Sequence, residues 1–286
     1  MHIEYAALNL FCTLTHFFAQ AAATMPVVLC VLPWIAKKPT LAFFAPLQTP
    51  LEQILPYLTL CGAFFIPASL GKVLAELSLH GHDFVWPNLL DKALLSYTVT
   101  FLLWIGLFLG ACLFKRSTAQ KPSPLWALFA LGFFASYCTF HYPFAGLPEG
   151  LTYQDAIPTI FLQAQHAYFY SFFPCGLVLL FVVRRLPHLV HTLHRRIVTN
   201  GCALIAIVGA IPTCLSSLGL LVGYRLRPAP LPLALYQEML HTIWLICIIL
   251  VLCALIARTK AQWLYKLLAI LLLLRILAPS CLLLFH

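Results

Sequence analysis

Hydrophobic residues follow one another along this chain in long runs that short polar segments separate. A membrane-spanning helix needs about 20 mostly apolar residues. Eight runs have that character, with soft boundaries, at residues 6–35, 54–79, 93–114, 125–145, 157–183, 198–223, 233–257 and 262–285. The pattern predicts an all-α polytopic membrane protein with eight transmembrane helices, and it leaves no stretch for a soluble domain.

Composition supports this prediction, because 62% of the residues are hydrophobic and only 9% are charged. A soluble domain of 286 residues cannot bury that much apolar surface. The 11 cysteines lie mostly inside the apolar runs and form no Cys-x-x-Cys pair, so we interpret them as small core residues. The N-terminal run has no basic segment before it, which favours a retained first span over a cleaved signal peptide.

The net charge of +9 is distributed unevenly between the two sides of the predicted membrane. Only Lys92, Arg225 and Arg227 fall on one side, and most of the other basic residues follow odd-numbered spans. These residues are Lys37, Lys38, Lys115, Arg116, Lys121, Arg184, Arg185, Arg195, Arg196, Arg258, Lys260 and Lys266. The positive-inside rule makes those loops cytoplasmic and both termini external. The charge thus indicates orientation in a membrane, with the bacterial cytoplasmic membrane as the expected location, rather than nucleic-acid binding.

The chain also resembles itself at an offset of roughly 145 residues. Residues 61–71 and 208–219 share Gly-Ala, then Pro, then Ser-Leu-Gly, and residues 115–120 resemble 257–262. A repeat of four spans keeps its orientation, so we predict two parallel four-helix bundles at residues 1–150 and 151–286. Internal symmetry of this kind is also found in transporters, so it does not decide the function.

Four residues with metal-binding side chains lie at a common depth in the predicted spans. Counting about 1.5 Å per helical residue places His16, His166, Met239 and His241 roughly 10–15 Å below the outer surface. A buried imidazole in lipid needs a partner, and imidazole or thioether ligands hold a haem between helices. Met239 and His241 are two residues apart and point to nearly opposite sides of their helix. Only one of them can face the same cofactor as His166, and the sequence leaves the choice open.

Charged residues inside the spans provide further candidates. Lys72 and Glu76 are four residues apart on one helix face, where their charges can neutralise each other. In the alternative, Lys72 binds a haem propionate and Glu76 takes part in proton movement. Arg275 in the last span is a second candidate for a propionate. The alternative for Arg275 is a pairing with a carboxylate inside the bundle.

Short segments along the chain resemble subunit I of the cytochrome bd-type quinol oxidases. The matching segments are Leu14-Thr15-His16-Phe17, the series Gly71, Glu76, Gly81 and Trp86, residues 126–132 and 147–150, Pro158 eight residues before His166, and Tyr236-Gln237-Glu238-Met239. The resemblance covers most of the chain in short, degenerate pieces. It implies two four-helix bundles with an external N-terminus.

The resemblance also implies functional residues and partners. His166 and Met239 would ligate a low-spin haem b, and His16 would ligate a further haem, of b or d type. A second membrane subunit of related fold is implied, with a quinol or a cytochrome as electron donor. The chain departs from the family at residues 96–100, which lack its paired glutamates, and at residues 224–233, where its long quinol-binding loop is reduced to about ten residues. The reduction of dioxygen and the oxidation of quinol are therefore left open.

Three hypotheses compete at this point. The first is a membrane haem protein that transfers electrons. The second is a small-solute or proton-coupled transporter, in which Lys72, Glu76 and the histidines line a path between the two repeats. The third is a structural subunit without haem. Bound cofactor, solute flux and co-purification with a partner distinguish the three.

Overall fold

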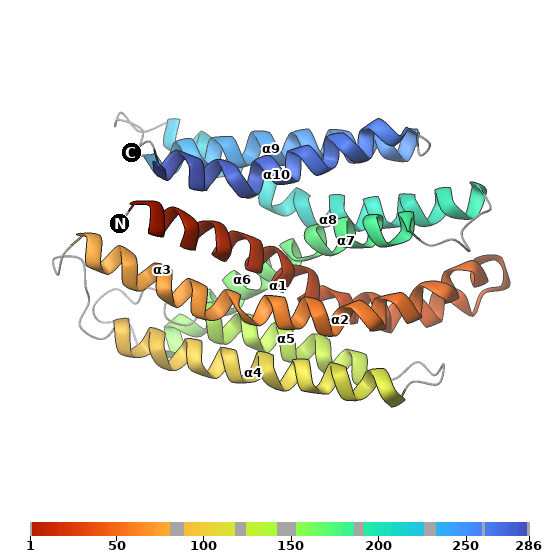
Figure 1. Ribbon diagram of the computed structural model, residues 1–286, viewed down its shortest axis with the longest axis horizontal. Helices are drawn as coiled ribbons and strands as arrows, with labels where there is room; N and C mark the ends of the chain where they lie inside the picture. The colour runs from red at the N-terminus through yellow and green to blue at the C-terminus, as the bar shows by residue number, and fades with distance from the viewer. Residues whose placement is uncertain are drawn as a thin grey trace. The chain divides into compact units, whose positions relative to one another are not determined.

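The fold is entirely helical in a computed structural model that describes residues 2–80, 89–117, 124–141, 153–185, 192–225, 233–258 and 261–284. Within these ranges no residue lies in a strand. The helices form two compact units (Figure 1). Unit 1 contains Met1–Ser171 with Ser280–His286, and unit 2 contains Phe172–Pro279.

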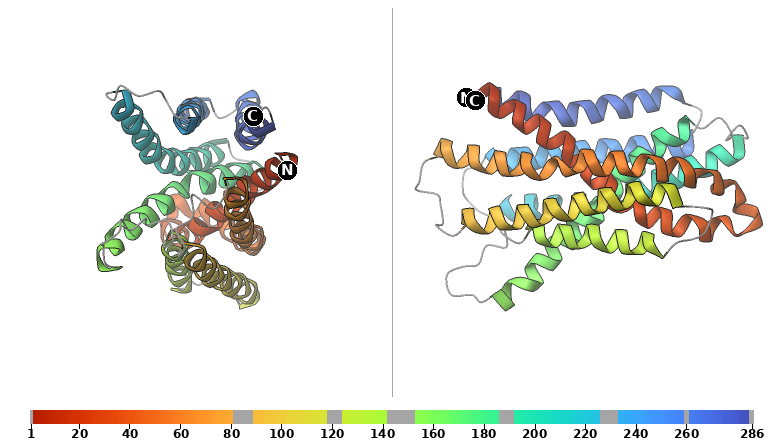
Figure 2. Two further views of the ribbon diagram at one scale, coloured as in Figure 1. Left: turned by 90° about the vertical axis from the view of Figure 1, so that its left-hand side faces the viewer. Right: turned by 60° about the horizontal axis from the view of Figure 1, so that its bottom comes forward.

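Unit 1 is organised around its first helix. Helix α1 contacts α2, α3, α5 and α6, and α4 packs against α2, α3 and α5. Figure 2 shows α4 and α5 side by side along this unit. The helices and their bounds are α1 (His2–Ala36), the 3-10 helix η1 (Pro39–Leu47), α2 (Gln48–Ala63), α3 (Phe65–His80), α4 (Leu89–Ser117), α5 (Leu125–His141) and α6 (Tyr153–Tyr170).

A glycine permits the close approach of α2 to α1. A Cβ atom added at Gly62 would lie 2.6 Å from the Cα atom of Ala19 and 2.6 Å from the ring of Trp104 on α4. Ala19 and two further small residues of α1, Ala22 and Ala23, are fully or almost fully buried. Association of helices in lipid depends on such small residues, which let backbones come close enough for extensive van der Waals contact.

Unit 2 contains α7 (Phe172–Arg184), α8 (Thr192–Arg225), α9 (Leu233–Ala257) and most of α10 (Gln262–Leu284), up to Pro279. Helix α8 packs against both α7 and α9. A Cβ atom at Gly176 of α7 would overlap the backbone of Ala206 on α8, so this pair of helices also approaches through a small residue. Side chains of α7 and α9 contact α10, through Arg184 over Tyr265 and through the Trp244 hydrogen bond to the Leu271 carbonyl.

Two of the predicted spans are interrupted. The run at 54–79 divides at Phe64 into α2 and α3, and the run at 157–183 divides at Ser171 into α6 and α7. In each case a proline follows three residues later, at Pro67 and Pro174. Proline has no N–H for the preceding turn and its ring crowds that turn, which weakens the helix at this point. Sequence analysis did not predict these two breaks.

Six helical stretches in the described ranges are long and apolar enough to cross a membrane, and α5 is a shorter apolar helix. Large apolar side chains face outward on them, such as Leu102 at 63% and Leu113 at 67% exposure on α4. Leucines exposed in such numbers are expected on a surface that faces lipid rather than water. The chain is therefore described as an integral membrane protein, whereas the count of eight spans, the repeat at 1–150 and 151–286 and the orientation stay predictions.

Candidate functional site

The predicted site residues divide between the two units. His16 on α1, Lys72 and Glu76 on α3 and His166 on α6 belong to unit 1. Met239 and His241 on α9 and Arg275 on α10 belong to unit 2. In unit 2 the structure brings two of the predicted residues together, His241 and Arg275.

His241 and Arg275 meet at one aromatic side chain, Trp244. The imidazole of His241 stacks on the indole with ring centroids 6.0 Å apart and planes 22° apart. The guanidinium carbon of Arg275 lies 5.6 Å from the indole centroid. Phe173 of α7 meets the same indole edge-on, with centroids 5.8 Å apart. We call these four residues the Trp244 cluster.

Helical spacing and one hydrogen bond explain how the Trp244 cluster forms. His241 and Trp244 are three residues apart on α9, and Leu271 and Arg275 are four apart on α10, so each pair shares a helix face. The indole Nε1–H donates to the carbonyl oxygen of Leu271 at 2.6 Å, which fixes the rotation of α10 against α9. Arg275 lies one turn after Leu271 on α10, so this hydrogen bond also brings the Arg275 side chain to the indole.

Arg275 places a permanent positive charge within an apolar helix. Its side chain is partly buried, and the indole face stabilises the cation by about 0.5–2 kcal/mol. The sequence of unit 2 contains a single acidic residue, Glu238, whose side chain lies outside the described ones, so no carboxylate occurs among the described side chains of this unit. The Trp244 cluster therefore sets a cation beside an imidazole within apolar helices.

His16 in unit 1 lies beside the break between α2 and α3. Its ring stacks on Phe65, the first residue of α3, with centroids 4.2 Å apart and planes 10° apart. Phe65 in turn contacts Phe140 of α5, which contacts Tyr97 of α4. One turn before His16, the thiol of Cys12 lies 3.5 Å from the Ser69 hydroxyl. Helix α3 thus presents an aromatic ring to His16 and a hydroxyl to Cys12, one turn earlier on α1.

The second break, at Ser171, is surrounded by hydroxyl groups. The Thr24 hydroxyl donates to the Ser171 carbonyl at 3.0 Å, and the Ser171 and Tyr137 hydroxyls lie 2.9 Å apart. The Tyr168 hydroxyl donates to the carbonyls of Ala23 and Ala130. This hydroxyl network ties α1 and α5 to the end of α6. Hydrogen bonds of this kind satisfy backbone groups where a helix is interrupted inside a membrane.

The remaining predicted residues are less enclosed. His166 is exposed on α6, Met239 is 37% exposed on α9, and Lys72 is partly buried on α3. The side chain of Glu76 lies outside the described ones. His166 and Met239 belong to different units, so their pairing on one haem stays a prediction. In the described ranges, no three His, Cys, Asp or Glu side chains gather closely enough to hold a metal ion.

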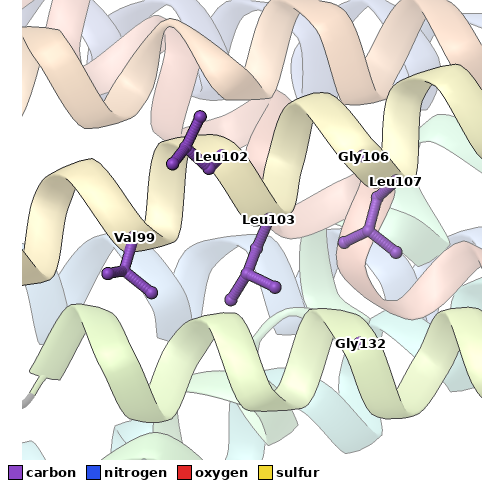
Figure 3. Close-up of a pocket in the computed structure, with 6 residues that line it drawn as sticks. All are labelled: Val99, Leu102, Leu103, Gly106, Leu107 and Gly132. Atoms are coloured by element: carbon purple, nitrogen blue, oxygen red, sulfur yellow. The ribbon is translucent and has the colours of Figure 1, made fainter.

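Residues of α4, together with Gly132 of α5, line an apolar groove of about 430 Å³ (Figure 3). Gly106 of α4 and Gly132 of α5 form part of its wall, together with Val99, Leu102 and Leu107. Apart from backbone atoms, the lining is entirely aliphatic. The groove therefore offers no group that binds a metal, a charge or a proton.

The sequence contained a partial signal for the Trp244 cluster. The spacing of His241 and Trp244 indicates a common face, but nothing along the chain indicates that this face meets α10. The hydroxyl network had no comparable signal, since Thr24 and Ser171 are 147 positions apart. Comparison with protein-family models, with curated proteins and with solved structures gives no match for this chain.

Proposed function

We propose that this chain is an integral membrane protein that binds haem b and transfers electrons, and that His241 in unit 2 would hold the haem iron. One observation carries the proposal: the Trp244 cluster holds an imidazole and a guanidinium at a single aromatic side chain within the apolar helices. An imidazole is the commonest protein ligand of b-type haem iron, and a guanidinium pairs with a propionate.

The chemistry of the donor set fits the proposed cofactor. A haem combines an apolar ring with two carboxylates, and the Trp244 cluster combines aromatic walls from Phe173 and Trp244 with one cation. His241 is partly buried, whereas Met239, which points to the other side of α9, is 37% exposed. Burial therefore favours His241 over Met239 as the ligand from α9.

A bound haem b supplies reversible one-electron chemistry at its iron. The residues of the chain would do the rest. His241 would hold the iron, Arg275 would orient a propionate, and Trp244, fixed by its bond to Leu271, would keep the guanidinium in place. Arg275 would also favour the reduced state electrostatically, since the reduced haem carries one more negative charge.

The proposal includes a further haem at His16 in unit 1. Aromatic side chains already flank this imidazole, and the break before Phe65 lets α3 begin beside it. The proposal extends to the type of this haem, to its reaction with dioxygen and to the roles of Lys72 and Glu76. It also includes a second membrane subunit that exchanges electrons with this chain, and co-purification tests for that subunit.

The decisive experiment is a reduced-minus-oxidised absorption spectrum with pyridine haemochrome quantitation on protein purified from haem-sufficient cells. We expect a sharp b-type band that His241→Ala removes or halves, while Met239→Ala retains it as the matched control on the same helix. His16→Ala reports separately on the second haem through the stoichiometry. A folded, haem-free preparation of the wild-type chain refutes the proposal.

A transporter is the second candidate, because two spans are broken at Phe64 and Ser171. Interrupted membrane helices commonly form the binding sites of transporters. Here both breaks contact α1, through His16 at the first and Thr24 at the second. This candidate predicts solute or proton flux in liposomes without bound haem. A haem-loaded protein that is inactive in flux assays eliminates it.

A further inference from the structure

The four helices of unit 2 meet at one end, and exposed basic side chains crowd that end. The end of α7, the start of α8, the end of α9 and the start of α10 all lie there, toward the right of the view in Figure 1. We call this the basic end of unit 2. Its exposed cationic residues are Arg184, Arg185, Arg195, Arg196, Arg258 and Lys266.

The net charge of the whole chain is concentrated in this unit. Residues 172–279 contain ten Lys or Arg and one acidic residue, so unit 2 carries a formal charge of +9, which equals that of the entire protein. Unit 1 has as many acidic as basic residues and is formally neutral. The single acid of unit 2, Glu238, is near the start of α9 and hence at the opposite end of that helix from Arg258. No carboxylate of unit 2 therefore lies at the same end as these described cations.

Two of the arginines are held in place rather than free in solvent. The guanidinium of Arg184 lies over the ring of Tyr265 on α10, 5.0 Å from its centroid. The Arg195 side chain on α8 donates a hydrogen bond to the Arg184 carbonyl at 3.1 Å. These contacts bring two guanidinium-bearing residues together from separate helices. The positive charges gathered at this end repel one another, and a bound anion relieves that repulsion.

An exposed tryptophan indicates where this end lies in a membrane. Trp263, the second residue of α10, is 59% exposed and lies two residues before Tyr265, which contacts Arg184. Tryptophan is enriched at the level of lipid headgroups, where its ring lies in the interface. The ends of apolar helices and an interfacial tryptophan place the arginines at the depth of lipid phosphates rather than in bulk water.

We infer that the basic end of unit 2 binds the headgroup of an anionic phospholipid, and specifically one that carries two phosphates. Guanidinium groups bind phosphate oxygens in pairs, and Arg184 and Arg195 supply two such groups from neighbouring helices. A lipid with two phosphates engages both at once, while its acyl chains cover the outward leucines of the unit. The inference is independent of the haem proposal, since none of its residues belongs to the Trp244 cluster.

The test measures lipid binding to the purified full-length chain by native mass spectrometry and by thermal unfolding in detergent. The probes are a diphosphate phospholipid, a phosphatidylcholine with the same acyl chains, and inorganic phosphate. Arg184→Gln/Arg195→Gln is the test variant. Lys37→Gln/Lys38→Gln is the matched control, because it also removes two exposed cations at a helix end, that of α1, where Lys37 lies over Trp34.

We expect the diphosphate lipid to stay bound and to raise the unfolding midpoint of the wild type and of the lysine variant. The arginine variant should lose most of that rise, with a Kd roughly tenfold or more higher, as expected for two lost contacts with an anionic headgroup. Equal losses in both variants would overturn the inference, because net charge alone would then explain binding. A rise produced by inorganic phosphate alone, or equally by phosphatidylcholine, would also overturn it.

Discussion

The indole of Trp244 on α9 donates a hydrogen bond to the backbone carbonyl of Leu271 on α10, with 2.6 Å between nitrogen and oxygen. An interhelical hydrogen bond in a membrane contributes about 0.6 kcal/mol on average and up to about 1.7 kcal/mol. This one also determines which face of α10 meets α9, and through that face it places Arg275 against the same indole. Loss of the donor should therefore weaken both contacts.

Replacing Trp244 by phenylalanine tests this relationship. Phenylalanine keeps an aromatic ring next to Phe173 but has no N–H for Leu271, so we expect the free energy of unfolding in detergent to fall by about 1 kcal/mol. Trp263→Phe is the control, since Trp263 is 59% exposed. Denaturant titrations of both variants give the comparison, and equal stabilities would contradict the role assigned to the hydrogen bond.

A second prediction concerns the hydroxyl network at the Ser171 break. Thr24→Val keeps the shape of the side chain but removes the donor to the Ser171 carbonyl in a site where Thr24 and Ser171 are fully buried. We expect a loss of about 1–2 kcal/mol, because the carbonyl at the break is left without this bond. Thr98→Val is the matched control, since the exposed Thr98 hydroxyl bonds within its own helix. Similar unfolding curves for the two variants would refute the prediction.

The third prediction concerns the approach of α2 to α1. A methyl group at Gly62 would lie 2.6 Å from the Ala19 backbone, so Gly62→Ala should separate the helices and destabilise unit 1 by about 1–3 kcal/mol. Gly106→Ala on α4 has nothing within 4 Å of its new methyl group and should be neutral or slightly stabilising. Thermal unfolding in detergent separates the variants, and an equally mild effect at both positions would contradict the packing described for Gly62.

The comparison of sequence with structure shows which features depend on local pattern. Every apolar run expected to form a helix lies largely in helices, because run length and leucine content determine helix formation locally. The breaks were missed because proline alone does not predict them. Helix α1 continues through Pro26 and Pro33, and α8 continues through Pro212. At Pro174 the break is accompanied by the hydroxyl network, which consists of contacts distant in sequence.

The candidate site could be predicted only in part, for a related reason. The charge and the apolar surroundings of Arg275 and the imidazole of His241 are visible in the sequence, and both were expected to be functional. Their meeting at Trp244 depends on how α9 and α10 are rotated about their axes, which residue spacing within one helix does not determine. His166 is exposed on α6, and its role as a haem ligand stays a prediction.

The last prediction joins the electrostatics of Arg275 to the proposed haem in unit 2. Removing the charge with Arg275→Gln should lower the midpoint potential, since the guanidinium favours the reduced haem; about 1 kcal/mol corresponds to roughly 40 mV for one electron. Arg275→Lys keeps the charge and should retain most of the potential. Lys266→Gln removes a charge from the same helix about 13 Å away along its axis and serves as the control. Redox titration of the b-type band supplies the values. An unchanged potential in Arg275→Gln, with the band intact, would place the haem away from the Trp244 cluster, because a cation in contact with a propionate in so apolar a setting cannot be removed without effect.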